Sequence, residues 1–296
     1  MALITNTRSE LSSFLLIYFL ELETFINSNT DELKKIKFQS EEANTDEFIK
    51  KYFKNLILSR SDINNTAIKK VSISSSKERH EIEVKDLFKF KITAVFIPSE
   101  LSAEQKSNIA KSKKSVNTNP DLLLKIEDGK NVYFESLELK STKNNNIPGS
   151  SVQQVSPLEW VIFVKRGEKK VEVSTGHYIN SITEKLPFPD RSPRPQVGFN
   201  TLLQWNEKNR VLQDGILTII DNPEITLQKI KLLQDWQDFL AMEWMTIIKS
   251  EDAKNNEKWF NNTLRIFAIK FLEYTNELSV DDRIRLLVKL NTLIKQ

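Results

Sequence analysis

The stretch from Asn119 to Thr142 constrains the fold most, because it has the pattern of two β-strands joined by a tight turn. The apolar run LLLKI precedes Asp128-Gly129, a dipeptide favoured in two-residue hairpin turns, and the run VYFESLELK follows it. A turn made of these two residues alone pairs Glu127 with Lys130. The sequence therefore predicts an antiparallel hairpin within the core sheet.

The same register places four polar side chains on one face of this hairpin. Asp121 then opposes Ser136, and strand alternation adds Glu138 and Lys140 to that face, while the intervening leucines point into a core. Asp121 and Glu138 become diagonal neighbours, roughly 7 Å apart. Two carboxylates at this separation can share one divalent cation, which lowers the pKa of a bound water and neutralises charge on a phosphate. Two acids and a lysine in this arrangement favour phosphodiester hydrolysis.

These residues also carry a family resemblance. Pro120-Asp121 followed by Glu138-Leu139-Lys140 resembles the PD-(D/E)xK nuclease signature, and the surrounding residues 120–180 resemble a type II restriction endonuclease of that superfamily. The resemblance implies that Asp121 and Glu138 bind Mg²⁺ and that Lys140 assists the attacking water, which makes all three catalytic. It also implies a restriction-endonuclease-like central mixed β-sheet flanked by helices.

Two points stay open at this stage. In the family, a helix before the hairpin sometimes supplies a further acid, and the candidates are Glu10, Glu42 and Glu47. The alternative interpretation of the hairpin is an ordinary solvated face on which Lys140 pairs with Glu138.

Composition excludes several other kinds of site. The formal net charge is only +3 over 296 residues, so nucleic-acid binding requires a local basic patch. The chain has no cysteine and two histidines, which excludes disulfides, zinc–thiolate sites and a histidine-rich metal centre. No GxxxxGK[ST] motif is present, so ATP is not an expected ligand. The apolar run FLLIYFL is too short to cross a membrane and is predicted to be a buried helix.

Periodicity predicts an α/β (α+β) fold with a helical C-terminal region. Helices are expected near residues 9–27 and 45–59 and, after a change of composition at Thr201, over residues 226–249, 252–275 and 280–295. The core sheet is expected from residues 90–97, 121–127, 132–140, 160–165 and 171–174, with a loop or edge hairpin at 60–80. We expect a catalytic domain over residues 1–200 and a helical region for recognition or dimerisation over 201–296, or one continuous domain.

Seven further residues are candidates for DNA contact. Arg191 and Arg194 lie in a loop stiffened by four prolines, and arginine forks suit guanine edges and phosphates. The others are Lys113 and Lys114 at the end of an expected helix, Lys143 after the ExK strand, and Gln153 and Gln154 in the following segment.

The sequence as a whole predicts a sequence-specific, Mg²⁺-dependent endonuclease of double-stranded DNA, cytoplasmic and homodimeric, without a membrane or ATP requirement. Two alternatives stay open. One is a structure-specific or repair nuclease of the same superfamily, and the other is a non-catalytic DNA-binding or scaffold protein. The DNA target, the cut position and the number of metal ions do not follow from the sequence.

Overall fold

A computed structural model describes residues 6–36, 47–75, 79–105, 120–151, 156–167, 170–183, 194–250 and 258–294. The chain forms two compact units, Met1–Gln234 and Asp235–Gln296. The division therefore falls 34 residues beyond the boundary expected at residue 200, because the segment after residue 200 adds strands and helices to the first unit.

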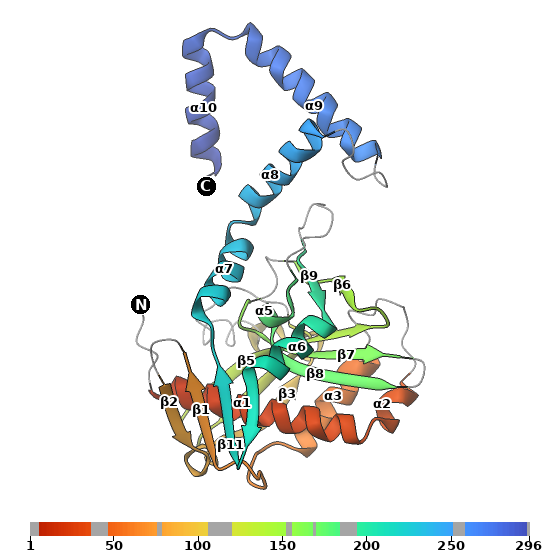
Figure 1. Cartoon of the computed structure of the whole chain (residues 1–296), viewed down its shortest axis with the longest axis vertical. Coiled ribbons are helices and arrows are strands. Elements are labelled where there is room, and N and C mark those ends of the chain that lie inside the picture. The colour runs from red at the N-terminus through yellow and green to blue at the C-terminus, as the bar shows by residue number, and fades with distance from the viewer. Residues whose placement is uncertain are drawn as a thin grey trace. The chain divides into compact units, whose positions relative to one another are not determined.

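The first unit is a mixed α/β structure, as expected (Figure 1). Its helices are α1 (Asn6–Ser28), α2 (Asp31–Lys35), α3 (Glu47–Ser59), α5 (Tyr178–Ser181), α6 (Phe199–Asn209), α7 (Pro223–Gln234) and two 3₁₀ turns, Val84–Leu87 and Pro98–Glu100. Its strands are β1 (Lys70–Ser74), β2 (Arg79–Glu83), β3 (Lys91–Phe96), β4 (Leu122–Glu127), β5 (Val132–Thr142), β6 (Asn146–Pro148), β7 (Trp160–Arg166), β8 (Val171–His177), β9 (Gln196–Gly198), β10 (Arg210–Gln213) and β11 (Ile216–Ile220).

The central sheet has the order β3-β4-β5-β7-β8, and these are the five strands expected from the sequence. Only β5 and β7 run parallel, so the sheet is mixed. A second sheet has the order β10-β11-β1-β2 and was not predicted as a sheet. Of the two structures expected near residues 60–80, a loop or an edge hairpin, the hairpin is present, because β1 and β2 pair antiparallel at the edge of this sheet. On its other side β1 pairs in parallel with β11. A short pair, β6-β9, completes the unit.

The central sheet has a hydrophobic cluster on each face. Trp160, Ile162 and Val164 of β7 belong to the cluster that contains α1, whereas Val161 and Phe163 belong to the cluster that contains α6. Because side chains alternate along a strand, α1 and α6 cover opposite faces. The run expected to be a buried helix is the centre of α1, where five of the seven residues of FLLIYFL are buried. Each fully buried side chain of this size contributes roughly 1.5–3 kcal/mol.

One buried acid connects α1 to both large sheets. Glu23 of α1 accepts hydrogen bonds from the backbone nitrogen and hydroxyl of Thr175 in β8, at 2.6 and 2.9 Å. Its other oxygen forms an ion pair of 2.6 Å with Arg210 of β10, and both side chains are 11% exposed. Glu23 therefore holds the helix against the central sheet and against the second sheet together.

The register of the central hairpin differs from the expected one. Glu127 pairs with Val132, so the loop contains four residues, 128–131, and the two-residue turn is wrong. The Asp128 carboxylate explains the longer loop, because it accepts hydrogen bonds from the backbone nitrogens of Lys130 and Asn131, at 2.9 and 2.7 Å. The register shift is two residues, and an even shift leaves every side chain on the face predicted for it.

The second unit consists of α8 (Trp236–Lys249), α9 (Lys258–Glu277) and α10 (Val280–Ile294). The helix expected over 226–249 is two helices, α7 and α8, separated at Asp235. Several aromatic residues that recur at helical spacing in these helices are exposed, among them Phe267, which is 63% exposed. The periodicity predicted helices correctly here, but not the burial of their apolar faces.

Candidate active site

The two predicted carboxylates lie at directly opposed positions rather than at diagonal ones. The last pair of the β4–β5 ladder is Leu122 with Leu137, and one further step aligns Asp121 with Glu138. An oxygen of Asp121 accepts a hydrogen bond of 2.9 Å from the backbone nitrogen of Leu139, which fixes the carboxylate against β5. Asp121 and Glu138 are each 6% exposed. The register shift therefore brings the two acids closer than the sequence predicted.

Lys140 lies beside Glu138, as predicted, and is more deeply buried than either acid. Its side chain is 2% exposed, and its ammonium lies 2.6 Å from a Glu138 oxygen. The ammonium also donates a 2.8 Å hydrogen bond to the Ser150 hydroxyl, which in turn donates to the same Glu138 oxygen. The pairing that the alternative interpretation expected is present, but the pair is buried and not part of a solvated face.

Tyr178, the first residue after β8, supports this cluster. The Tyr178 hydroxyl of α5 accepts a 2.8 Å hydrogen bond from the backbone nitrogen of Ser150. Burial, and then the nearby Glu138 charge, raise the pKa of Tyr178 above its usual range. Tyr178 therefore stays protonated and fixes the Ser150 segment next to Glu138.

A second lysine, Lys50, was not predicted to be part of this site. Lys50 comes from α3, and its ammonium lies 2.7 Å from the second oxygen of Asp121. Its side chain is 16% exposed. Each carboxylate of the site therefore has its own ammonium partner, Lys50 for Asp121 and Lys140 for Glu138. A divalent cation that binds both acids has to displace these ammonium groups from the oxygens it uses.

Electrostatics at Asp121 are unfavourable to its charge despite Lys50. Burial, and then the negative charge of Glu138, raise the pKa of Asp121, while Lys50 and the Leu139 hydrogen bond act in the opposite direction. Desolvation and a second carboxylate shift acids in this way, and such shifts are typical of functional sites. A cation at this position would relieve both effects.

The raised pKa of Asp121 predicts a pH dependence of stability. The folded chain holds this proton more tightly than the unfolded chain, so the contribution to stability is fully present below about pH 4 and is lost as the pH rises towards the folded-state pKa. We expect the free energy of unfolding, measured by urea denaturation in EDTA, to contain this falling component in the wild type and to lack it in Asp121→Asn. The control is Asp214→Asn, an exposed turn position with φ +51° that asparagine tolerates. Identical pH profiles for Asp121→Asn and wild type would contradict the assignment.

The donor set suits a hard divalent cation. Asp121 and Glu138 provide carboxylate oxygens, the ligand type that Mg²⁺ prefers. Within the part of the chain that the structure describes, no group of three or more His, Cys, Asp or Glu residues is placed to hold a metal ion. Of the upstream acids, Glu10 pairs with Lys89 and Glu47 with Lys51, and Glu42 lies outside the described residues. The remaining ligands of a cation here would be water and substrate oxygens.

The candidates for DNA contact are only partly described. Lys143 and Arg194 are exposed, whereas Lys113, Lys114, Gln153, Gln154 and Arg191 lie outside the described residues. The pairing of β6 with β9 brings the Arg194 segment to the site, since the Pro195 carbonyl accepts a 2.8 Å hydrogen bond from the nitrogen of Gly149. Gly149 directly precedes Ser150, so Arg194 is close in the fold to residues that contact Glu138.

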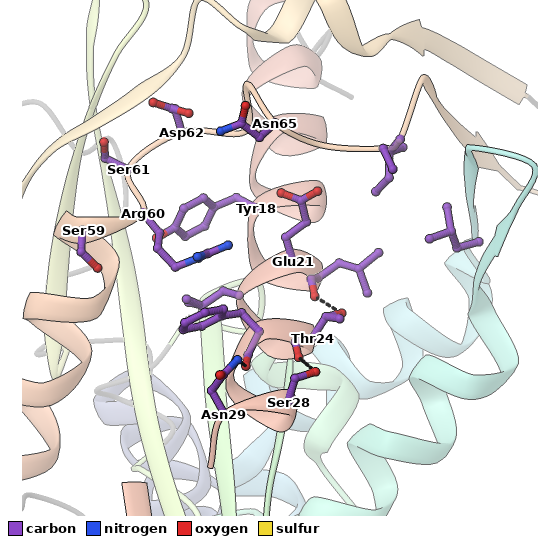
Figure 2. Close-up of a pocket in the computed structure, with 16 residues that line it drawn as sticks. Tyr18, Glu21, Thr24, Ser28, Asn29, Ser59, Arg60, Ser61, Asp62 and Asn65 are labelled. Carbon is purple, nitrogen blue, oxygen red and sulfur yellow. Dashed lines mark hydrogen bonds between the residues drawn. The ribbon is translucent and has the colours of Figure 1, made fainter. Parts of the chain in front are cut away.

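A cavity of about 650 Å³ lies elsewhere, between α1 and the segment that follows α3 (Figure 2). Figure 2 shows Tyr18 and Glu21 of α1 facing Arg60, whose guanidinium lies 4.0 Å from the centre of the Phe25 ring. The hydroxyls of Thr24 and Ser28 donate to backbone carbonyls of their own helix. These two hydroxyls are therefore bonded within the helix, and the cavity contains none of the three predicted catalytic residues.

Comparison with known proteins adds no relative: no family model, curated protein or solved structure matches the chain. Among the described helices, none combines the length and the apolar character needed to cross a membrane.

Proposed function

We propose that the chain is a Mg²⁺-dependent endonuclease that hydrolyses phosphodiester bonds of double-stranded DNA at specific sequences, as a homodimeric type II restriction enzyme of the PD-(D/E)xK superfamily. The observation that carries the proposal is the burial of two opposed carboxylates and a lysine, Asp121, Glu138 and Lys140, on one face of a mixed sheet. Burying three charged groups together is costly unless they are paired, and such clusters are commonly functional.

Each residue has a distinct role in this proposal. Asp121 and Glu138 hold the cation, which supplies an acidified water and neutralises charge on the phosphate. Lys140 donates from its ammonium to the water or to a phosphate oxygen. Ser150 is hydrogen-bonded to both Glu138 and Lys140 and holds these two side chains in position next to each other. The backbone nitrogen of Leu139 orients Asp121.

A DNA digest tests the proposal. Unmethylated phage DNA of known sequence is incubated with the wild type in Mg²⁺ and in EDTA, beside Glu138→Gln and Glu135→Gln. Glu135 is a matched control, because it lies on the same strand, with its side chain on the opposite face from Glu138. Discrete fragments for the wild type and Glu135→Gln, only with Mg²⁺, are the expected result.

Two other results of the digest would each support one of the alternative functions. Cleavage restricted to flaps, junctions or ends would make the chain a structure-specific or repair nuclease with the same chemistry. No cleavage of any of these substrates, with Mn²⁺ also supplied, would overturn the enzymatic proposal and leave a binding or scaffold protein.

A further inference from the structure

A second cavity, of about 630 Å³, lies where α5, α6 and the β11–α7 connection meet. Its volume falls within the range of about 300–1,000 Å³ that is usual for small-molecule sites. Its charged lining residues are Lys208, Lys229, Asp221 and Glu224, so two positive and two negative groups balance. This balance disfavours a strongly anionic ligand and favours a neutral, polar one.

Two nearly buried amides in this cavity have unused hydrogen-bonding capacity. Asn180 is 7% exposed and lines the cavity, and within the described residues its side chain makes no hydrogen bond. Asn209 is 9% exposed, and its amide nitrogen donates 2.9 Å to the Trp205 carbonyl, whereas its amide oxygen has no partner in the described chain. Neither amide is among the fully enclosed polar atoms without a partner, so both are reached from the cavity, where a ligand with donors and acceptors would pair with them.

The remaining lining narrows the class of ligand. Trp205 is half-buried and provides an aromatic wall, which suits a planar ring. An asparagine amide presents a donor and an acceptor side by side, and this pair matches the N6 and N7 edge of adenine. The cavity beside α1 differs in this respect, because the two asparagines that line it, Asn29 and Asn65, are both exposed.

We propose that this cavity is a binding site for an adenine base, in which Asn180 and Asn209 hydrogen-bond the base edge beside Trp205. Asn180 is two residues from Tyr178, whose hydroxyl holds Ser150 next to Glu138. The short helix α5 therefore connects the base site to the candidate active site. That the base belongs to a nucleic acid, as an unpaired nucleotide, rests on the proposed function; the affinity for the base does not.

Calorimetric titration of the full chain with adenosine, in EDTA, tests the site without any requirement for cleavage. We expect saturable binding at micromolar to millimolar adenosine, weakened about 10-fold or more in Asn180→Leu. Asn180→Asp replaces the amide donor with a second acceptor and is expected to weaken binding as well. Asn65→Leu, an exposed asparagine of the other cavity, should bind as the wild type does. Cytidine should bind more weakly than adenosine.

A duplex with one unpaired adenine, compared with the fully paired duplex, distinguishes the source of the base. Tighter binding of the unpaired duplex, lost in Asn180→Leu, assigns the site to nucleic acid, and equal binding of the two duplexes assigns it to a free nucleoside. Absence of adenosine binding at several millimolar, or wild-type affinity in Asn180→Leu and Asn180→Asp, would overturn the base site. Since EDTA is present throughout, a failure of DNA cleavage leaves this result unaffected.

Discussion

Replacement of Lys140 by methionine is expected to slow Mg²⁺-dependent DNA cleavage by about 10²–10⁴-fold, the range for loss of a group that assists proton transfer. Methionine retains the length and apolar character suited to a side chain that is 2% exposed. It removes the ammonium that lies 2.6 Å from Glu138 and bonds Ser150. Single-turnover cleavage of a duplex containing the target site measures the effect.

The same variant separates chemistry from metal binding. Because the ammonium would compete with a bound cation for a Glu138 oxygen, Lys140→Met should bind Mg²⁺ at least as tightly as the wild type in calorimetric titration. Lys125→Met is the matched control, since Lys125 lies on the same hairpin, pairs with Glu127 and is 32% exposed. Wild-type cleavage by Lys140→Met would mean that Lys140 only balances the charge of Glu138.

The largest expected effect on stability is that of Glu23→Ala, a loss of about 3–5 kcal/mol in the free energy of unfolding. The substitution leaves the Arg210 guanidinium, 11% exposed, without its carboxylate, and removes the acceptor of two Thr175 hydrogen bonds. A buried charge without a partner is costly, and here the loss also separates α1 from both large sheets. Urea denaturation at neutral pH gives the value.

Glu21→Ala provides the comparison on the same helix. Glu21 is partly exposed, lies two residues earlier and makes no ion pair within the described chain. Its removal should change the free energy of unfolding by less than about 0.5 kcal/mol. Equal losses in the free energy of unfolding for the two variants would show that the ion pair and hydrogen bonds of Glu23 add nothing to stability.

Two Asp-Gly dipeptides show how far local sequence determines this fold. Asp214-Gly215 forms a two-residue turn, with φ values of +51° and +76° and Gln213 paired with Ile216. The sequence predicted such a turn at Asp128-Gly129, where the loop has four residues instead. The dipeptide permits the tight turn in both places. The hydrogen bonds that Asp128 accepts from the following backbone nitrogens decide against it.

The candidate site was predictable where it depends on strand alternation and unpredictable where it depends on packing. Asp121, Glu138 and Lys140 share a face because side chains alternate along a strand. This result does not change when the predicted register is wrong by an even number of residues. Lys50 could not be identified, because its approach to Asp121 depends on how α3 packs beside the sheet. Pairing of β1 with β11 joins residues 146 positions apart in the chain, and no local pattern specifies such a partner.

The two lysines of the site also determine how a metal ion would enter it. The acids already have resident cations, Lys50 and Lys140, each supplied by the chain itself. Binding of a divalent ion at this face would therefore exchange one cation for another, and its apparent affinity would be the difference between the attraction of the acids for the ion and their attraction for the ammonium groups. If the proposed role is right, the ion pairs balance the charge of the acids when Mg²⁺ is scarce, and the site would take up the ion only when Mg²⁺ outcompetes the tethered ammonium groups.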